Sequence, residues 1–342
     1  MSYLDSKRII GTNTQRVGAD AISGGWKEIG RASVTSGDTI NVTSLADKRY
    51  LMVLGCGIGS GNVALISRFN SDTGNNYNNR YSSNGGADAT SGANDRLFTN
   101  GSGSSPQEFS VFHVANKSNK EKMLVGHNVN NATAGAGTAP QRREYANKWA
   151  NTSSAISSLN VFNSDSGDFA SGSEVVVLGY DPDDTHTDNF WELLDDSSWS
   201  SGDNWTSGTF TAKKYLWVQF YTEGGAGSSY FRFNGDSGNN YSNRYSINGG
   251  SDSTIASQPE SYLGAIDGLS FHNLFIINNA SNEKLFTHQR VSRSSAGAGT
   301  APTRNEGAGK WANTSNQITS ITVTTAGGGN LTAGNMKVWG SN

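Results

Sequence analysis

One phrase of nineteen residues occurs twice in this chain. Residues 68–86 read RFNSDTGNNYNNRYSSNGG and residues 232–250 read RFNGDSGNNYSNRYSINGG, so fifteen positions are identical at a separation of 164 residues. A second phrase repeats in the same way: AGAGTAPQRREYANKWANTS at residues 134–153 returns as AGAGTAPTRNEGAGKWANTS at residues 296–315. Because the offset stays near 162–164, the pattern predicts one duplicated domain rather than an array of short repeats.

The ends of the two copies can be placed from the sequence. Each copy begins near a tryptophan, Trp26 in the first and Trp191 in the second. The stretch DPDDTHTD at residues 181–188 is acidic and contains a proline, which is typical of a short linker. The sequence therefore predicts an N-terminal arm at residues 1–23, domain 1 at residues 24–182 and domain 2 at residues 183–342.

Inside each copy, short runs alternate between apolar and polar residues. KKYLWVQFYT, for example, places Leu216, Val218 and Phe220 on one face of an extended segment. Similar runs, rich in β-branched and aromatic residues, are bounded by Gly, Asn or Ser, and sustained helical periodicity is absent. We expect an all-β chain of two tandem homologous β-sandwich domains, jelly-roll-like, with an extended N-terminal arm. A closed barrel remains an alternative.

Composition excludes several classes of protein. The net charge of −3 over 342 residues gives no basic surface for nucleic acid or for an anionic membrane. No run approaches the roughly 18 apolar residues of a membrane span. The start, MSYLDSKRII, carries charges where a signal peptide needs an apolar stretch, so we expect synthesis in a cytoplasm without export by the ordinary secretory route. The single cysteine, Cys56, cannot form an intrachain disulfide.

The repeated phrase contains weak candidates for a calcium site. Asp72 and Asp236, with neighbouring asparagines, offer oxygen ligands, but the calcium-loop template needs a ligand at its fifth position, where Gly74 stands. A looser calcium site stays open. The other interpretation is turn chemistry, in which Asp and Asn bind backbone groups and Gly supplies positive φ. No cofactor is expected.

The same phrase contains aromatic and guanidinium side chains that stack on sugars or form protein interfaces. They are also consistent with a strand whose arginine lies against an acidic neighbour, so both interpretations stay open. The candidate ligand or interface residues are Tyr77, Arg80 and Tyr81 in the first copy and Tyr241, Arg244 and Tyr245 in the second.

No set of catalytic residues is repeated. The five histidines do not occupy equivalent places in the two copies, and none has a metal-binding spacing. Glu144 and Glu306 recur, but each lacks a partner carboxylate at a defined spacing. We therefore expect a protein that is not an enzyme.

Several phrases resemble virion structural proteins of tailed bacteriophages, especially those of aquatic and marine hosts. They are WKEIGR, RFNxDxGxNYxxRYSxNGG, AGAGTAPxRxExxxKWANTS and GDFASGSEVVVLGYD, together with the opening MSYLDSKRIIGT. The resemblance covers nearly all of the chain, although the second copy ends in NMKVWGSN instead. It implies a non-enzymatic building block of the virion: a tail, fibre or head-decoration component.

The resemblance also implies partners. They are other virion proteins and further copies of this chain in a symmetric oligomer, with a trimer as one option. The arm would add a strand to a neighbour through Tyr3, Leu4, Ile9 and Ile10. The alternative function is a receptor- or carbohydrate-binding module of a phage adsorption apparatus, with a host-surface glycan or receptor as the ligand.

Overall fold

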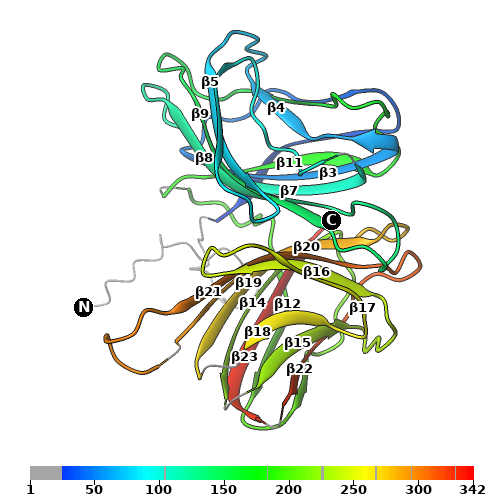
Figure 1. Ribbon diagram of the computed structural model, residues 1–342. Helices are drawn as coiled ribbons and strands as arrows, with labels where there is room; N and C mark the ends of the chain where they lie inside the picture. Colours follow the sequence, from blue (N-terminus) through cyan, green and yellow to red (C-terminus); the bar gives the residue numbers. More distant parts are fainter. Residues whose placement is uncertain are drawn as a thin grey trace. The chain divides into compact units, whose positions relative to one another are not determined.

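The computed structural model describes residues 25–103, 105–182, 184–224, 227–265, 268–293, 295–327 and 329–342. Within these ranges the chain is all-β and contains no helix, so the all-β class predicted from the sequence is confirmed (Figure 1). None of the described segments is a helix that could cross a membrane. The four expected contact residues of the arm, Tyr3, Leu4, Ile9 and Ile10, lie outside the described residues.

The chain divides into two compact units. The first unit contains the described residues up to Ala132 together with Gln141–Glu192, and the second contains Thr133–Pro140 together with Leu193–Asn342. The sequence placed the boundary at residue 182. In the structure the segment before Glu192 is held in the first unit, where the Phe190 N–H donates to the carbonyl of Trp26 at 2.8 Å and Lys27 pairs with Asp188 at 2.8 Å.

The first unit has two antiparallel sheets. The larger has the strand order β1-β11-β3-β7-β8-β9-β5-β6 and the smaller has the order β2-β10-β4. The strands are β1 (Lys27–Val34), β2 (Thr39–Val42), β3 (Tyr50–Val63), β4 (Ile66–Phe69), β5 (Tyr77–Ser83), β6 (Ala89–Asn94), β7 (Ser105–Ala115), β8 (Lys122–Asn130), β9 (Gln141–Trp149), β10 (Leu159–Phe162) and β11 (Ser173–Tyr180).

The second unit also has a large and a small sheet. Their orders are β12-β23-β14-β19-β20-β21-β16-β17 and β13-β22-β15-β18, so the large sheet has corresponding strands in the same order as in the first unit. The strands are β12 (Glu192–Trp199), β13 (Asn204–Thr206), β14 (Tyr215–Gly224), β15 (Ser228–Phe233), β16 (Tyr241–Ile247), β17 (Ser253–Gln258), β18 (Ser261–Ala265), β19 (Ser270–Ile277), β20 (Lys284–Ser292), β21 (Thr303–Trp311), β22 (Ile321–Ala326) and β23 (Leu331–Ser341).

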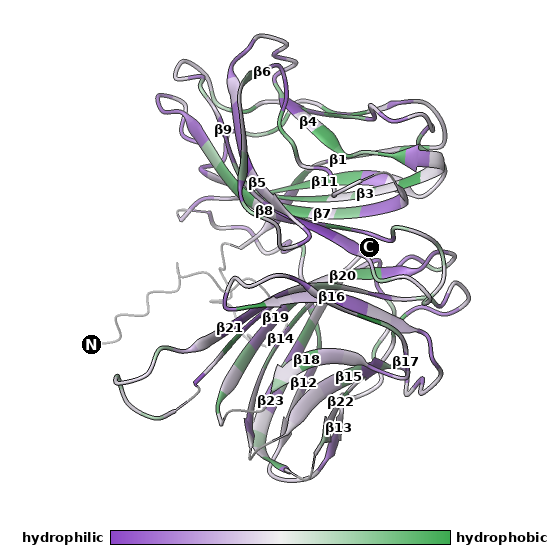
Figure 2. Cartoon of the chain, viewed as in Figure 1, coloured by the Kyte–Doolittle hydropathy of each residue, from purple (hydrophilic) through white to green (hydrophobic). Residues whose placement is uncertain are grey.

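Each unit buries its own apolar core, and side chains from both of its sheets contribute. In the first unit Val53 of β3 packs in the same cluster as Ile40 of β2 and Val161 of β10. In the second unit Val218 of β14 packs in the same cluster as Val323 of β22. Figure 2 shows the hydrophobic colouring along β3, β7 and β11, whereas the connecting turns are mostly hydrophilic. β11 is buried along its whole length and β3 along most of it, so residues on both faces of these strands are buried.

Candidate functional site

The repeated phrase forms the end of one strand, a tight turn and the next strand. In the first unit it covers the end of β4, the turn at Asp72 and all of β5. The Asp72 carboxylate accepts hydrogen bonds from the Gly74 N–H at 2.8 Å, from the Asn76 amide at 2.9 Å and from the Trp149 indole N–H at 2.7 Å. These three donors lower the pKa of Asp72, against the opposing effect of desolvation, which is the largest single influence.

The turn of the second unit repeats this arrangement. Asp236 accepts from the Gly238 N–H at 2.8 Å, from the Asn240 amide at 2.9 Å and from the Trp311 indole at 2.7 Å. Both carboxylate oxygens therefore face N–H donors, which is the wrong polarity around a cation. The described residues contain no group of three or more His, Cys, Asp or Glu positioned to hold a metal. The geometry favours the turn-chemistry interpretation.

The asparagine that precedes each turn also binds the backbone. The Asn70 side-chain oxygen accepts from the N–H groups of Ser157 at 2.8 Å and Ser158 at 3.1 Å, just before β10. Asn234 does the same with Thr319 at 2.8 Å and Ser320 at 3.1 Å. Both asparagines have positive φ, 51° and 53°. Asn is one of the few residues that adopt this conformation readily, which accounts for its presence in both copies.

Tyr77 and Tyr241 are core residues. Both side chains are fully buried, and their rings stack on Trp149 and Trp311 with centroids 6.3 Å apart in each unit. The Tyr77 hydroxyl accepts from the Phe69 N–H at 3.0 Å, and the Tyr241 hydroxyl accepts from the Phe233 N–H at 2.8 Å. Burial raises the pKa of both hydroxyls. A ligand cannot stack on rings in this position, so for these two tyrosines the geometry favours the structural interpretation of the two that the sequence left open.

The other four candidates lie nearer the surface. Arg80 is exposed and pairs with Asp88 at 3.3 Å, whereas Tyr81 is partly buried under the Arg143 guanidinium, 4.6 Å from its ring centroid. In the second unit the Arg244 Nε donates to the carbonyl of Pro140 at 2.9 Å, and Tyr245 packs against Tyr262 with centroids 4.8 Å apart. Arg80 and Arg244 thus have equivalent positions but different surroundings.

A hollow of about 490 Å³ lies beside Arg80 in the first unit, and we name it the polar hollow because most of the residues that line it have polar side chains. Its lining includes Asn78, Thr90 and Lys148, which come from β5, β6 and β9. The Lys148 ammonium pairs with Glu121 at 3.2 Å. Amide, hydroxyl and cationic groups give this hollow many hydrogen-bond donors, which suit a ligand that presents carbonyl or hydroxyl oxygens.

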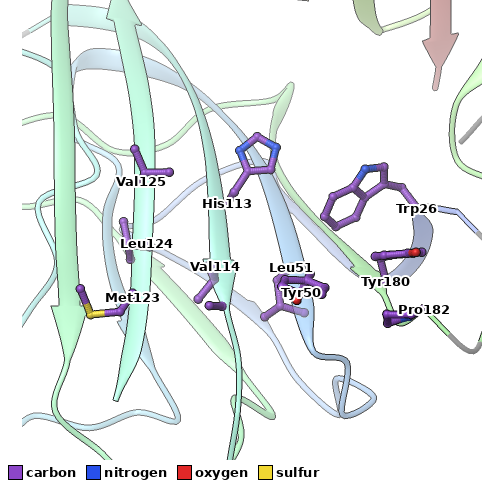
Figure 3. A pocket seen from close by; sticks show the side chains of 11 residues that line it. Trp26, Tyr50, Leu51, His113, Val114, Met123, Leu124, Val125, Tyr180 and Pro182 are labelled. Atoms are coloured by element: carbon purple, nitrogen blue, oxygen red, sulfur yellow. The ribbon is translucent and has the colours of Figure 1, made fainter. Parts of the chain in front are cut away.

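A second hollow, of about 650 Å³, is apolar and was not predicted from the sequence. Figure 3 shows Trp26 facing His113, with Tyr180 and Pro182 below Trp26 and with Met123 and Val125 on β8. Burial lowers the pKa of His113 to about 4, so its ring is neutral at pH 7. The apolar residues are continuous in β3 (Leu51–Leu54) and in β8 (Met123–Val125), so the sequence alone does not show which face of these strands is uncovered. Such a patch is typical of a protein–protein contact.

One buried carboxyl group has no access to either hollow. The Glu108 side chain is fully buried and accepts hydrogen bonds from the N–H groups of Leu65 at 3.0 Å and Gly101 at 3.1 Å. Burial raises its pKa to about 7. Glu108 lies opposite Gly57 in the pairing of β7 with β3, and the corresponding pair of the second unit is Ser270 with Thr222. This carboxyl group lines neither of the two hollows and has no counterpart in the second unit, so it is part of the packing of the first unit.

Comparison with known proteins does not identify a family. No protein-family profile and no curated protein matches the sequence. Solved structures with some similarity include Ail, the attachment invasion locus protein of Yersinia pestis, at 8% identity over 78% of this chain and 98% of that one, with a TM-score of 0.12. Neisserial surface protein A has 9% identity over 82% and 99% of the two chains, with a TM-score of 0.13. Scores this low carry no argument about fold or function.

Proposed function

We propose that this chain is a non-enzymatic structural protein of a tailed-bacteriophage virion, in a tail, fibre or head-decoration position. In this proposal each unit is a β-sandwich of the jelly-roll type, made in tandem by duplication. The chain would be synthesised in the host cytoplasm and would function in the particle, assembled with other virion proteins and with further copies of itself.

The observation that carries the proposal is that side chains shared by both copies form hydrogen bonds within their own unit. Asp72 and its counterpart Asp236 bind a tryptophan indole in the same way, and Tyr77 and its counterpart Tyr241 bind the backbone of the preceding strand. Asp72, Tyr77 and their counterparts in the second unit stabilise the fold of each unit, which is what a building block requires.

The alternative, a receptor- or carbohydrate-binding module, has one observation in its favour. The polar hollow beside Arg80 has hydrogen-bond donors suited to sugar hydroxyls. Against it, Tyr77 and Tyr241 are buried, and Arg244 is engaged with the carbonyl of Pro140. Binding of a glycan array by the recombinant chain, lost in Arg80→Ala, would favour this alternative.

Mass spectrometry of purified phage particles tests the proposal. Particles of the phage that encodes this sequence should contain the chain in a fixed ratio to the major capsid protein through successive density gradients. A non-structural protein of the same phage serves as the control for carry-over from the lysate. The proposal is wrong if the chain is abundant in infected cells and falls with that control as the particles are purified.

A further inference from the structure

The heptapeptide AGAGTAP occurs at Ala134–Pro140 and again at Ala296–Pro302, and its two copies have different surroundings. The first copy is within Thr133–Pro140, which belongs to the second unit together with Leu193–Asn342. It lies there against β16, β17 and β21 and against the residue that precedes β20. In the second copy, the residues from Ser295 to Pro302 are exposed.

The second unit binds the segment Thr133–Pro140 through the backbone of that segment. Every hydrogen bond described between them ends on a backbone N–H or carbonyl group of the segment. At the two ends of the segment, Lys310 Nζ donates to the Thr133 carbonyl at 2.6 Å and Arg244 Nε donates to the Pro140 carbonyl at 2.9 Å. Between them, the Gly135 N–H donates to the Glu283 carboxylate. The Ala136 carbonyl accepts from the Ser242 hydroxyl and from the Ser257 N–H, the latter at 2.8 Å.

The exposed copy already has part of the bound conformation. Gly135, in the bound copy, has φ of 84°, and Gly297, its counterpart, has φ of 85°. This region of φ favours glycine, so the sequence itself selects the turn. A segment that holds its bound conformation before binding loses less conformational entropy when it binds.

The first unit has the surface that corresponds to the one holding Thr133–Pro140. In β5, Arg80 lies opposite Ala146 and Asn78 lies opposite Lys148; in β16, Arg244 lies opposite Ala308 and Ser242 lies opposite Lys310. Ala93, the counterpart of Ser257, has the same φ of 52°. The polar hollow is lined by these residues of β5 and β9.

The exposed fractions show what the bound segment covers. In the second unit the Lys310 and Glu283 side chains are 0% and 5% exposed. In the first unit the corresponding pair, Lys148 and Glu121, is 37% and 42% exposed. Arg80 is 59% exposed, against 20% for Arg244. The first unit thus has the same lysine, arginine and glutamate on an open surface, with the Asn78 amide in place of the Ser242 hydroxyl.

We propose that the polar hollow of the first unit binds the segment Ser295–Pro302 of a second copy of this chain. Lys148 donates to the Ser295 carbonyl, Glu121 accepts from the Gly297 N–H, and Arg80 donates to the Pro302 carbonyl. The contact joins unlike surfaces of the two chains, so it is heterologous and leads to a ring or to an open filament. It supplies the contact between copies that the proposed virion role needs, but it is tested on the purified chain alone.

Two variants test the contact: the first disables the hollow of the first unit, and the second disables the segment Ser295–Pro302. Glu121→Ala with Lys148→Ala removes Lys148, which lines the hollow, together with its exposed partner Glu121. Gly297→Val places a β-branched residue at φ of 85°, where a Cβ meets nothing within 4 Å, so the exposed turn changes and the rest of the unit does not. The matched controls are Lys117→Ala, at an exposed lysine before β8, and Gly37→Val, at a glycine with φ of 91° and nothing within 4 Å of its Cβ position.

Sedimentation equilibrium of the full-length chain measures the result. We expect the wild type and both controls to form oligomers, and each disabled variant to associate at least tenfold more weakly. When the two disabled variants are mixed they should form a one-to-one dimer, because the intact hollow of one binds the intact segment of the other and no further contact is left. Circular dichroism checks that each variant is folded.

A synthetic peptide SAGAGTAP gives a second measurement that does not depend on the folding of a variant. It should dissociate wild-type oligomers, whereas a peptide with valine in place of the first glycine should not. The proposal is overturned if the wild type is a single chain at all concentrations, if the disabled variants associate as the wild type does, or if their mixture gives no dimer. None of these results depends on whether the chain is found in a virion.

Discussion

The indole N–H of Trp149 donates a hydrogen bond to the carboxylate of Asp72 at 2.7 Å, across 77 residues of sequence. Trp311 and Asp236 make the same bond at 2.7 Å across 75 residues. The two phrases that repeat in the sequence therefore meet in space: Asp72 belongs to one and Trp149 to the other. Each copy forms this contact only if it contains both phrases, which explains why both phrases occur in each copy.

Removing the hydroxyl of Tyr77 should affect stability, not binding. Tyr77→Phe removes its hydrogen bonds with the Phe69 backbone, and we expect a loss of about 1 kcal/mol in the free energy of unfolding. Tyr77→Ala should cost about 3–5 kcal/mol, because it leaves a cavity beside Trp149. Urea denaturation measures both. Arg80→Ala, on the same strand but exposed, is the control, with an expected change within about 0.5 kcal/mol.

Glu108 should make the stability of the first unit depend on pH. Burial raises its pKa from 4.5 to about 7, so between these values the folded chain keeps a proton that the unfolded chain has released. The free energy of unfolding therefore falls as the pH rises through this window.

The matched variant is Glu108→Gln, which cannot ionise. Relative to this variant, the free energy of unfolding of the wild type should fall by about 2–3 kcal/mol between pH 4.5 and pH 7.5, since each pKa unit corresponds to about 1.4 kcal/mol. Denaturation at a series of pH values gives the difference. A wild-type minus variant difference that stays constant with pH would show that Glu108 ionises normally in the folded chain.

Cys56 should report on unfolding of the first unit. It is the only cysteine, it is fully buried in β3, and it lies opposite Glu174 of β11 and Phe109 of β7. A thiol reagent should therefore react more than about a hundredfold more slowly with the native chain than with the chain in denaturant, because reaction needs local opening of a core strand. Rapid labelling of one thiol in native buffer would show that β3 is accessible.

The all-β class could be predicted because strand periodicity is local. The alternation in KKYLWVQFYT is sufficient to identify β14, and its apolar face packs in the core as expected. The burial of Tyr77 was harder to predict. In β5 the alternation places Tyr77 inside and Arg80 outside, but the surrounding Asn and Gly residues made the whole phrase resemble a loop.

Other features depend on contacts that are distant in sequence. The segment Thr133–Pro140 belongs to the second unit through hydrogen bonds to residues 104–177 positions away in the chain, and they involve its backbone rather than its side chains. No local pattern encodes such contacts. The exposure of Met123 and Val125 could not be predicted from the sequence either, because an apolar strand residue is usually a core residue.

Equilibrium unfolding of Asp72→Ala and of Asp236→Ala tests most directly whether the repeated residues hold each unit together. Each change leaves a buried indole N–H without its acceptor, so we expect the affected unit to lose about 1–3 kcal/mol, by similar amounts in the two variants. Asp38→Ala, at an exposed aspartate, should stay within about 0.5 kcal/mol of the wild type. Unfolding of both aspartate variants at the wild-type denaturant concentration would contradict this account.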